Sequence, residues 1–205
     1  MRSTRRSWYV LTCLSLLMFC PSTFAQSSWR PFPVSYFDAI GSWFGRAIPK
    51  DGATICPAGA PGCPVPKEIV MVFTFNADGT FIGIDSNIFA GGTHSTAHGQ
   101  WKPTWPATIN ATFTLLQSSP PTATTPSVFI GGFKNLFQAN MTDHDAMEGQ
   151  IDAYLYSYTD PQGAAIVGSD GLPTPSPLSP VSQCTPPGCV HLGVFTFKAK
   201  RVAVE

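Results

Sequence analysis

Eight short segments of the chain alternate apolar and polar residues with a period of two. In IVMVFTF, for example, Ile69, Met71, Phe73 and Phe75 fall on one face. This alternation is typical of β-strands that bury one face. It predicts an all-β protein with almost no helix, apart from a turn near residues 36–40. The expected strands are residues 41–48, 69–75, 80–85, 97–101, 107–116, 128–142, 149–158 and 193–202.

The connections between these segments alternate in length. Those after the first, third, fifth and seventh strands are long, and those after the second, fourth and sixth are short. Successive connections of a meander lie at opposite ends, so all long loops fall at one end. Eight such strands most simply form an antiparallel up-and-down β-barrel, which leaves no exposed edge. A two-sheet β-sandwich is the structural alternative.

Residues 1–25 have the features of a secretory signal peptide. Arg2, Arg5 and Arg6 form a basic start, an apolar run follows, and small residues occupy the positions before Gln26. Residues 26–205 then form a single barrel domain of sensible size for one core. We therefore expect an exported protein, periplasmic or extracellular, with no membrane span.

Charge disfavours a nucleic-acid partner. Three of the 12 Lys and Arg lie in the expected signal, which leaves 9 basic against 12 acidic residues. The one basic cluster is Lys198, Lys200 and Arg201, which alternation assigns to a strand. Nothing here suggests a phosphate-binding surface.

Four cysteines remain after the expected cleavage: Cys56, Cys63, Cys184 and Cys189. An even number in an exported chain predicts two disulfides. The short loops CPAGAPGC and CTPPGC could each close on themselves, and cross-pairing between the loops is the alternative. Zinc binding by these cysteines is disfavoured, because the compartment is oxidising and no matching His spacing accompanies them.

The stretch IGSWFGRA gives one strand face to a large aromatic residue and to small ones. Gly41, Trp43 and Gly45 point inward, so Trp43 fills the narrow floor of the barrel while the glycines let the wall bend. The last strand ends at the same place. Arg201 falls on the same face of this strand as its apolar residues, so it is expected to point inward and stack on the Trp43 indole.

These residues resemble a known pattern. Gly41-Ser42-Trp43 after a helical turn, together with Arg201 on the last strand, looks like the lipocalin and wider calycin barrels. Gly41-x-Trp43-x-Gly45 also resembles the nitrobindin-like haem barrels. The long disulfide-bearing loops depart from both. The resemblance implies a barrel that binds a small hydrophobic or amphipathic ligand, and makes His191 a candidate axial ligand for haem.

The expected function is burial of such a ligand against apolar side chains under the long loops, with no catalysis. For each candidate, core packing is the competing interpretation. One alternative is an enzyme on the same barrel, an isomerase, a cyclase or a haem-dependent enzyme, with an inward His or carboxylate of shifted pKa. Another is a filled barrel that binds a protein partner through residues 159–190. The ligand-contact candidates are Met71, Phe73, Phe81, Trp101, Phe113, Phe133 and Phe195.

Other polar groups carry weaker expectations, and no cofactor or metal is expected. His94 and His98 would share a face in an extended strand and could bind zinc, although exposed loop histidines are the favoured interpretation. Asp143-His144-Asp145 with Glu148 is expected to be a solvated turn at the closed end. Tyr154, Tyr156 and Tyr158 form a stripe whose parity, opposite to that of Leu155, favours an outward direction.

Overall fold

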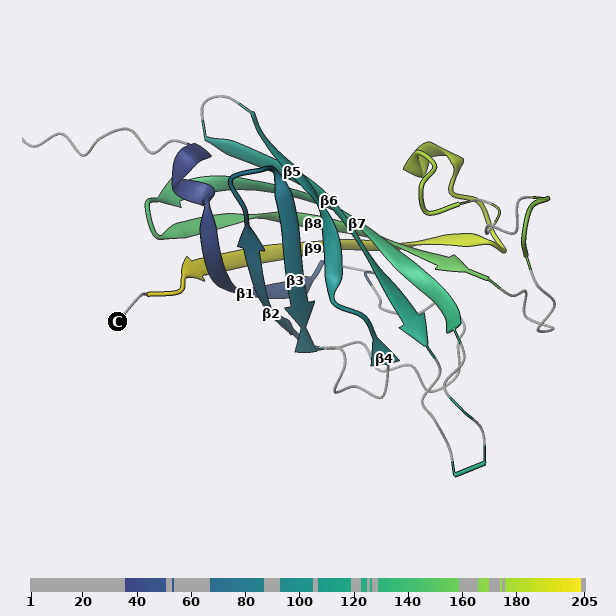
Figure 1. Ribbon diagram of the computed structural model, residues 1–205. Coiled ribbons are helices and arrows are strands. Elements are labelled where there is room, and N and C mark those ends of the chain that lie inside the picture. The colour runs from purple at the N-terminus through teal and green to yellow at the C-terminus, as the bar shows by residue number, and fades with distance from the viewer. Residues whose placement is uncertain are drawn as a thin grey trace, which may run out of the picture. The chain divides into compact units, whose positions relative to one another are not determined.

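The strands of the protein were located in a computed structural model (Figure 1). The expected signal peptide, Cys56 and Cys63 lie outside the described residues. The structure describes residues 36–50, 53, 67–86, 93–104, 107–118, 123–124, 126, 129–158, 166–169, 174 and 176–203.

Eight long strands are present in the described part of the chain, and each coincides with an expected segment. A ninth strand, β4 (Thr93–His94), has only two residues, and η1 (Tyr36–Ala39) and η3 (Val181–Gln183) are short 3-10 turns. The prediction of an all-β fold is confirmed. The long strands are β1 (Gly41–Pro49), β2 (Ile69–Phe75), β3 (Thr80–Asp85), β5 (Ala97–Thr104), β6 (Thr108–Ser118), β7 (Phe129–Asp143), β8 (Ala146–Ser157) and β9 (Cys189–Arg201).

The sheet closes on itself. Each long strand pairs antiparallel with the next one in the chain, and β1 also pairs with β9. The β6–β7 pairing completes the ring, so the eight long strands form an up-and-down barrel. The sandwich alternative is therefore wrong, because two separate sheets would each end in edge strands, whereas each of the eight long strands has a neighbour on both sides.

Loop lengths place the two ends of the barrel. Residues 76–79 connect β2 to β3 in a tight turn, in which Gly79 has a φ of +85° and Asp78 accepts a hydrogen bond from the backbone of Thr80. Only two residues separate β7 from β8. The long connections all lie at the other end, as expected, which is termed the loop end.

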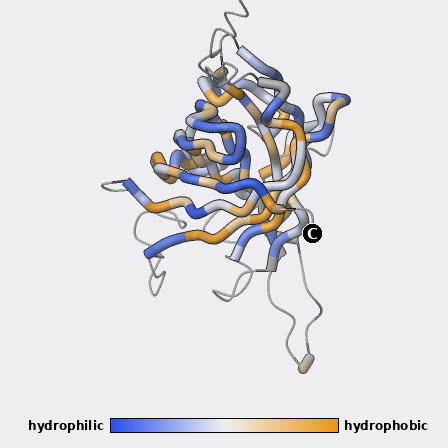
Figure 2. Tube along the Cα trace, turned by 90° about the vertical axis from the view of Figure 1, so that its left-hand side faces the viewer, coloured by the Kyte–Doolittle hydropathy of each residue, from blue (hydrophilic) through white to orange (hydrophobic). Residues whose placement is uncertain are grey.

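Alternation along the strands separates the core from the surface (Figure 2). On β1, Trp43, Gly45 and Ala47 are buried while Phe44 and Arg46 are exposed. Because successive side chains of a strand point to opposite faces, this pattern directs the first set into the barrel. The same parity rule assigns the inward residues of the other strands.

Aromatic side chains span the interior in the half nearer the tight turns. Phe73 on β2 packs against the rings of Phe81 and Phe197, with centroids 5.8 and 5.9 Å away. The ring of Phe137 on β7 lies 5.9 Å from Phe73 and 5.8 Å from Phe75. Since β2 and β7 are four strands apart in either direction around the ring, these contacts cross the barrel. This half of the interior is filled by side chains.

Candidate functional site

The floor of the barrel is built around Trp43. Its indole is fully buried, and Nε1 donates a hydrogen bond to the Ala39 carbonyl of η1 at 2.8 Å. The guanidinium carbon of Arg201 lies 4.5 Å from the centroid of the indole ring. Gly41 has a φ of +132°, and a Cβ there would lie 2.7 Å from Nη1 of Arg201. A residue with a side chain would be strained at this φ and would crowd the Arg201 guanidinium, so position 41 requires glycine.

Arg201 joins three segments at this floor. In Figure 1 the C-terminal end of β9 lies at the same end of the barrel as η1. Nη1 donates to the Ile40 carbonyl and Nε donates to the Asp145 carboxylate, both at 2.9 Å. Nη2 donates to the carbonyls of Asp38 and His144. The guanidinium therefore ties η1, the β7–β8 turn and β9 together.

The turn at residues 143–145, which was expected to be solvated, contributes to these contacts of Arg201. His144 Nδ1 lies 3.2 Å from Asp38, and Asp145 accepts from Arg201. Glu148 pairs instead with Lys198 on the outer surface, at 3.1 Å. These contacts are structural.

The seven ligand-contact candidates fall into two groups. Five are buried within the aromatic packing or beside it. Two others, Met71 and Phe133, share the inward parity of their strands but are only partly buried. Both lie toward the loop end, beyond the layer of rings. The buried five are Phe73, Phe81, Trp101, Phe113 and Phe195.

A pair of charged residues lies near Met71. Asp85, the last residue of β3, is the cross-strand neighbour of Met71 and continues the inward parity of Phe81. His94 of β4 places Nε2 at 3.1 Å from Asp85 Oδ1, and its side chain is only 5 % exposed. Asp85 was not identified as a site residue from the sequence, although the alternation along β3 places it on the inward face.

His94 and His98 do not share a face, so the zinc-binding alternative is wrong. The favoured interpretation, two exposed histidines, is correct for His98 and wrong for His94, whose side chain is buried. The chain leaves the extended ladder at Ser95 and Thr96, between β4 and β5. His94 pairs with Gln117 and points inward, whereas His98 pairs with Thr114 and is exposed. This break reverses the side-chain parity that an uninterrupted strand would have given.

The contacts of His94 favour the imidazolium form. Nε2 faces the Asp85 carboxylate, and Nδ1 lies 2.8 Å from the Ser95 carbonyl. Neither partner can donate a hydrogen bond, so both ring nitrogens must carry protons to satisfy them. The hydrogen bond with Asp85 raises the pKa of His94 above its ordinary value of 6.5, against the effect of burial. The pair is neutral as a unit and links β3 to β4.

We predict that the stability added by His94 falls as pH rises. The folded-state pKa exceeds the unfolded value, so the contribution is complete below about pH 6.5 and is lost as pH passes the folded pKa. Urea unfolding of wild type and of His94→Gln from about pH 5 to about pH 9 measures this difference. The exposed His98→Gln is the matched control. A constant difference across this range would contradict the prediction.

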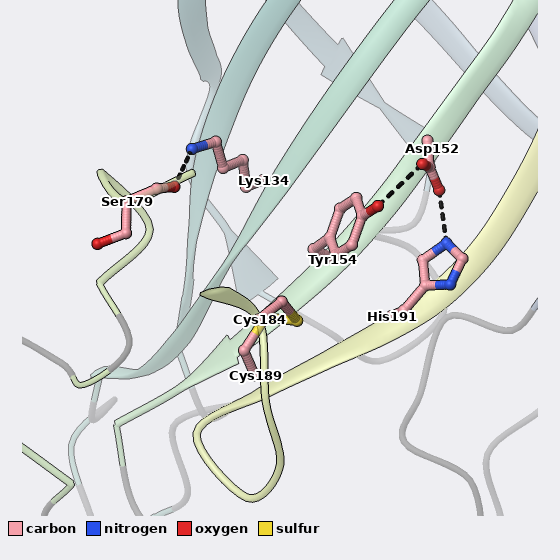
Figure 3. Close-up of a disulfide and its surroundings, with 7 residues drawn as sticks. All are labelled: Lys134, Asp152, Tyr154, Ser179, Cys184, Cys189 and His191. Carbon is pink, nitrogen blue, oxygen red and sulfur yellow. Dashed lines mark hydrogen bonds and ion pairs between the residues drawn. A yellow bond between two sulfur atoms is a disulfide. The ribbon is translucent and has the colours of Figure 1, made fainter. Parts of the chain in front are cut away.

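A second polar cluster lies on the outer face of β8 and β9 (Figure 3). Asp152 accepts hydrogen bonds from Tyr154 at 2.9 Å and from His191 Nε2 at 2.5 Å. The rings of Tyr154 and His191 stack at 4.8 Å. Burial and the bond to Asp152 raise the pKa of Tyr154 to about 12. His191 thus points away from the barrel interior.

Part of the connection between β8 and β9 covers this outer face (Figure 3). The ammonium of Lys134 donates to the Ser179 carbonyl at 2.7 Å, and burial lowers the pKa of Lys134. Tyr156 has the outward parity expected for the tyrosine stripe but is fully buried. Strand parity predicted that Tyr156 points outward, but it could not predict that the connection between β8 and β9 covers this face.

Cys184 and Cys189 form a disulfide within one loop, with a Cα–Cα distance of 5.0 Å. This excludes cross-pairing between the two cysteine loops. Within the part of the chain that the structure describes, no three His, Cys, Asp or Glu side chains gather as a metal site would require.

Comparisons with known proteins found no matching family model, no matching curated protein and no matching solved structure. In the described ranges, none of the helices has the length and apolar character needed to cross a membrane.

Proposed function

We propose that the protein binds a small apolar or amphipathic molecule inside the barrel, between the aromatic layer and the loop end. The observation that carries this proposal is that Met71 and Phe133 are only partly buried. Both point inward, yet both keep accessible surface while the neighbouring inward residues are buried. Accessible apolar surface inside a closed barrel is typical of a ligand site.

We also propose that the barrel is lipocalin-like and that the chain is exported. The packing of Trp43 against Arg201 supports the first proposal, and the Cys184–Cys189 disulfide supports the second. An enzyme on this barrel would need a free acid or base within it. Binding is favoured because both ring nitrogens of His94 are already engaged.

Uptake of N-phenyl-1-naphthylamine, a neutral dye that fluoresces in apolar surroundings, tests the proposal on the oxidised full chain. We expect saturable uptake, weakened about tenfold by Phe133→Ala through the loss of apolar contact. Leu136→Ala, on the opposite face of β7, is the matched control and should leave uptake unchanged. Absence of saturable uptake would instead favour a filled barrel that acts through its loops.

A further inference from the structure

Asn135 is a polar side chain in the wall of an apolar barrel. It lies on β7 between Phe113 of β6 and Ala153 of β8, both buried inward residues. Lys134, the preceding residue, points outward to Ser179, so parity directs Asn135 inward. Asn135 is only 8 % exposed.

The amide of Asn135 has no partner within the described structure. No hydrogen bond joins its side chain to another described residue, although buried amides are nearly always hydrogen-bonded. Among the described residues, the wholly enclosed side-chain atom without a partner is the Tyr156 hydroxyl. The Asn135 amide is therefore not wholly enclosed, and strand parity directs it to the interior of the barrel.

The charged groups that the structure describes on this side of the interior are already neutralised. His94 and Asp85 pair with each other, and the second nitrogen of His94 is held by the Ser95 carbonyl. Lys134 lies on the outer face, and Arg201 lies at the opposite end. Among the described residues, a charged ligand group would have to break the His94–Asp85 pair to find a counter-ion here.

We propose that the ligand carries an uncharged polar group that can hydrogen-bond, such as a hydroxyl or carboxamide, and that Asn135 recognises it. This inference rests on the proposed function and adds the chemical class of the head group. Asn135 offers both a donor and an acceptor, so it matches such groups in either direction. Phe133, two residues along the same face of β7, would contact the apolar part of the same molecule.

Displacement of bound N-phenyl-1-naphthylamine by dodecanamide, dodecanoate and dodecylamine near neutral pH tests this assignment. We expect dodecanamide to displace the dye at a concentration at least about fivefold lower than the charged compounds, as one hydrogen bond allows. A charge by itself makes a compound more soluble in water and can weaken its binding. Variants at Asn135 are therefore needed to test whether this side chain recognises the head group.

Asn135→Leu, which has nearly the same shape, should weaken dodecanamide binding about fivefold relative to dye binding measured in the same variant. Asn135→Asp should instead shift the preference toward dodecylamine, and it serves if the leucine variant does not fold. Equal displacement by dodecanoate and dodecanamide, or unchanged dodecanamide binding in both variants, would overturn the head-group assignment alone. Failure of the wild type to bind the dye would overturn the proposed function and this inference with it.

Discussion

Replacing Trp43 by alanine is expected to lower the free energy of unfolding by about 3–5 kcal/mol. The indole is fully buried at the floor and its Nε1 is bonded to Ala39. Its removal would leave a cavity between Arg201 and the aromatic layer, and a closed barrel can collapse into such a space only slightly. Urea unfolding followed by circular dichroism measures the loss.

The matched control is the neighbouring Phe44→Ala. Phe44 is 47 % exposed on the outer face of the same strand, so its removal should cost below about 1 kcal/mol. Similar losses for the two variants would show that Trp43 has no special place in the core.

Arg201→Ala is expected to cost about 3 kcal/mol, because hydrogen bonds from a charged donor are worth more than neutral ones and their carbonyl partners would be left unpaired. The side chain is 27 % exposed, which moderates the loss. Arg201→Lys should recover less than half of it, since an ammonium cannot reach the dispersed acceptors or stack as a plane on Trp43.

Unfolding by urea again provides the measurement, with the exposed neighbour Lys200→Ala as control. If Arg201→Lys were as stable as wild type, the charge at the floor and not the shape of the guanidinium would account for the stability.

The barrel could be predicted from the sequence because its signals are local. Period-two alternation defined each strand, and short connections at residues 76–79 and 143–146 indicated which end of the barrel carries the tight turns. Strand parity also indicated that Trp43 and Arg201 point inward. Their register as direct partners follows from barrel closure, which pairs β1 with β9.

Much of the candidate site could not be predicted, since it depends on distances across the barrel and on departures from ideal strands. Parity places Phe73 and Phe137 inside but does not say that their rings meet and fill one half. The interruption at Ser95 and Thr96 reversed His94 relative to His98. Asn135 lies between apolar residues and carries no pattern of its own, so the sequence could not show that its amide lacks a hydrogen-bond partner among the described residues.

The pairing of β1 with β9 also determines when the barrel can close during folding. Trp43 lies opposite Arg201, so the first barrel strand acquires its second neighbour only when β9, the last strand of the barrel, is available. Until then β1 presents an open edge, and Phe44 and Val72 form part of an exposed apolar outer face. Hairpins of neighbouring strands can form earlier, but the ring cannot close before β9 pairs with β1.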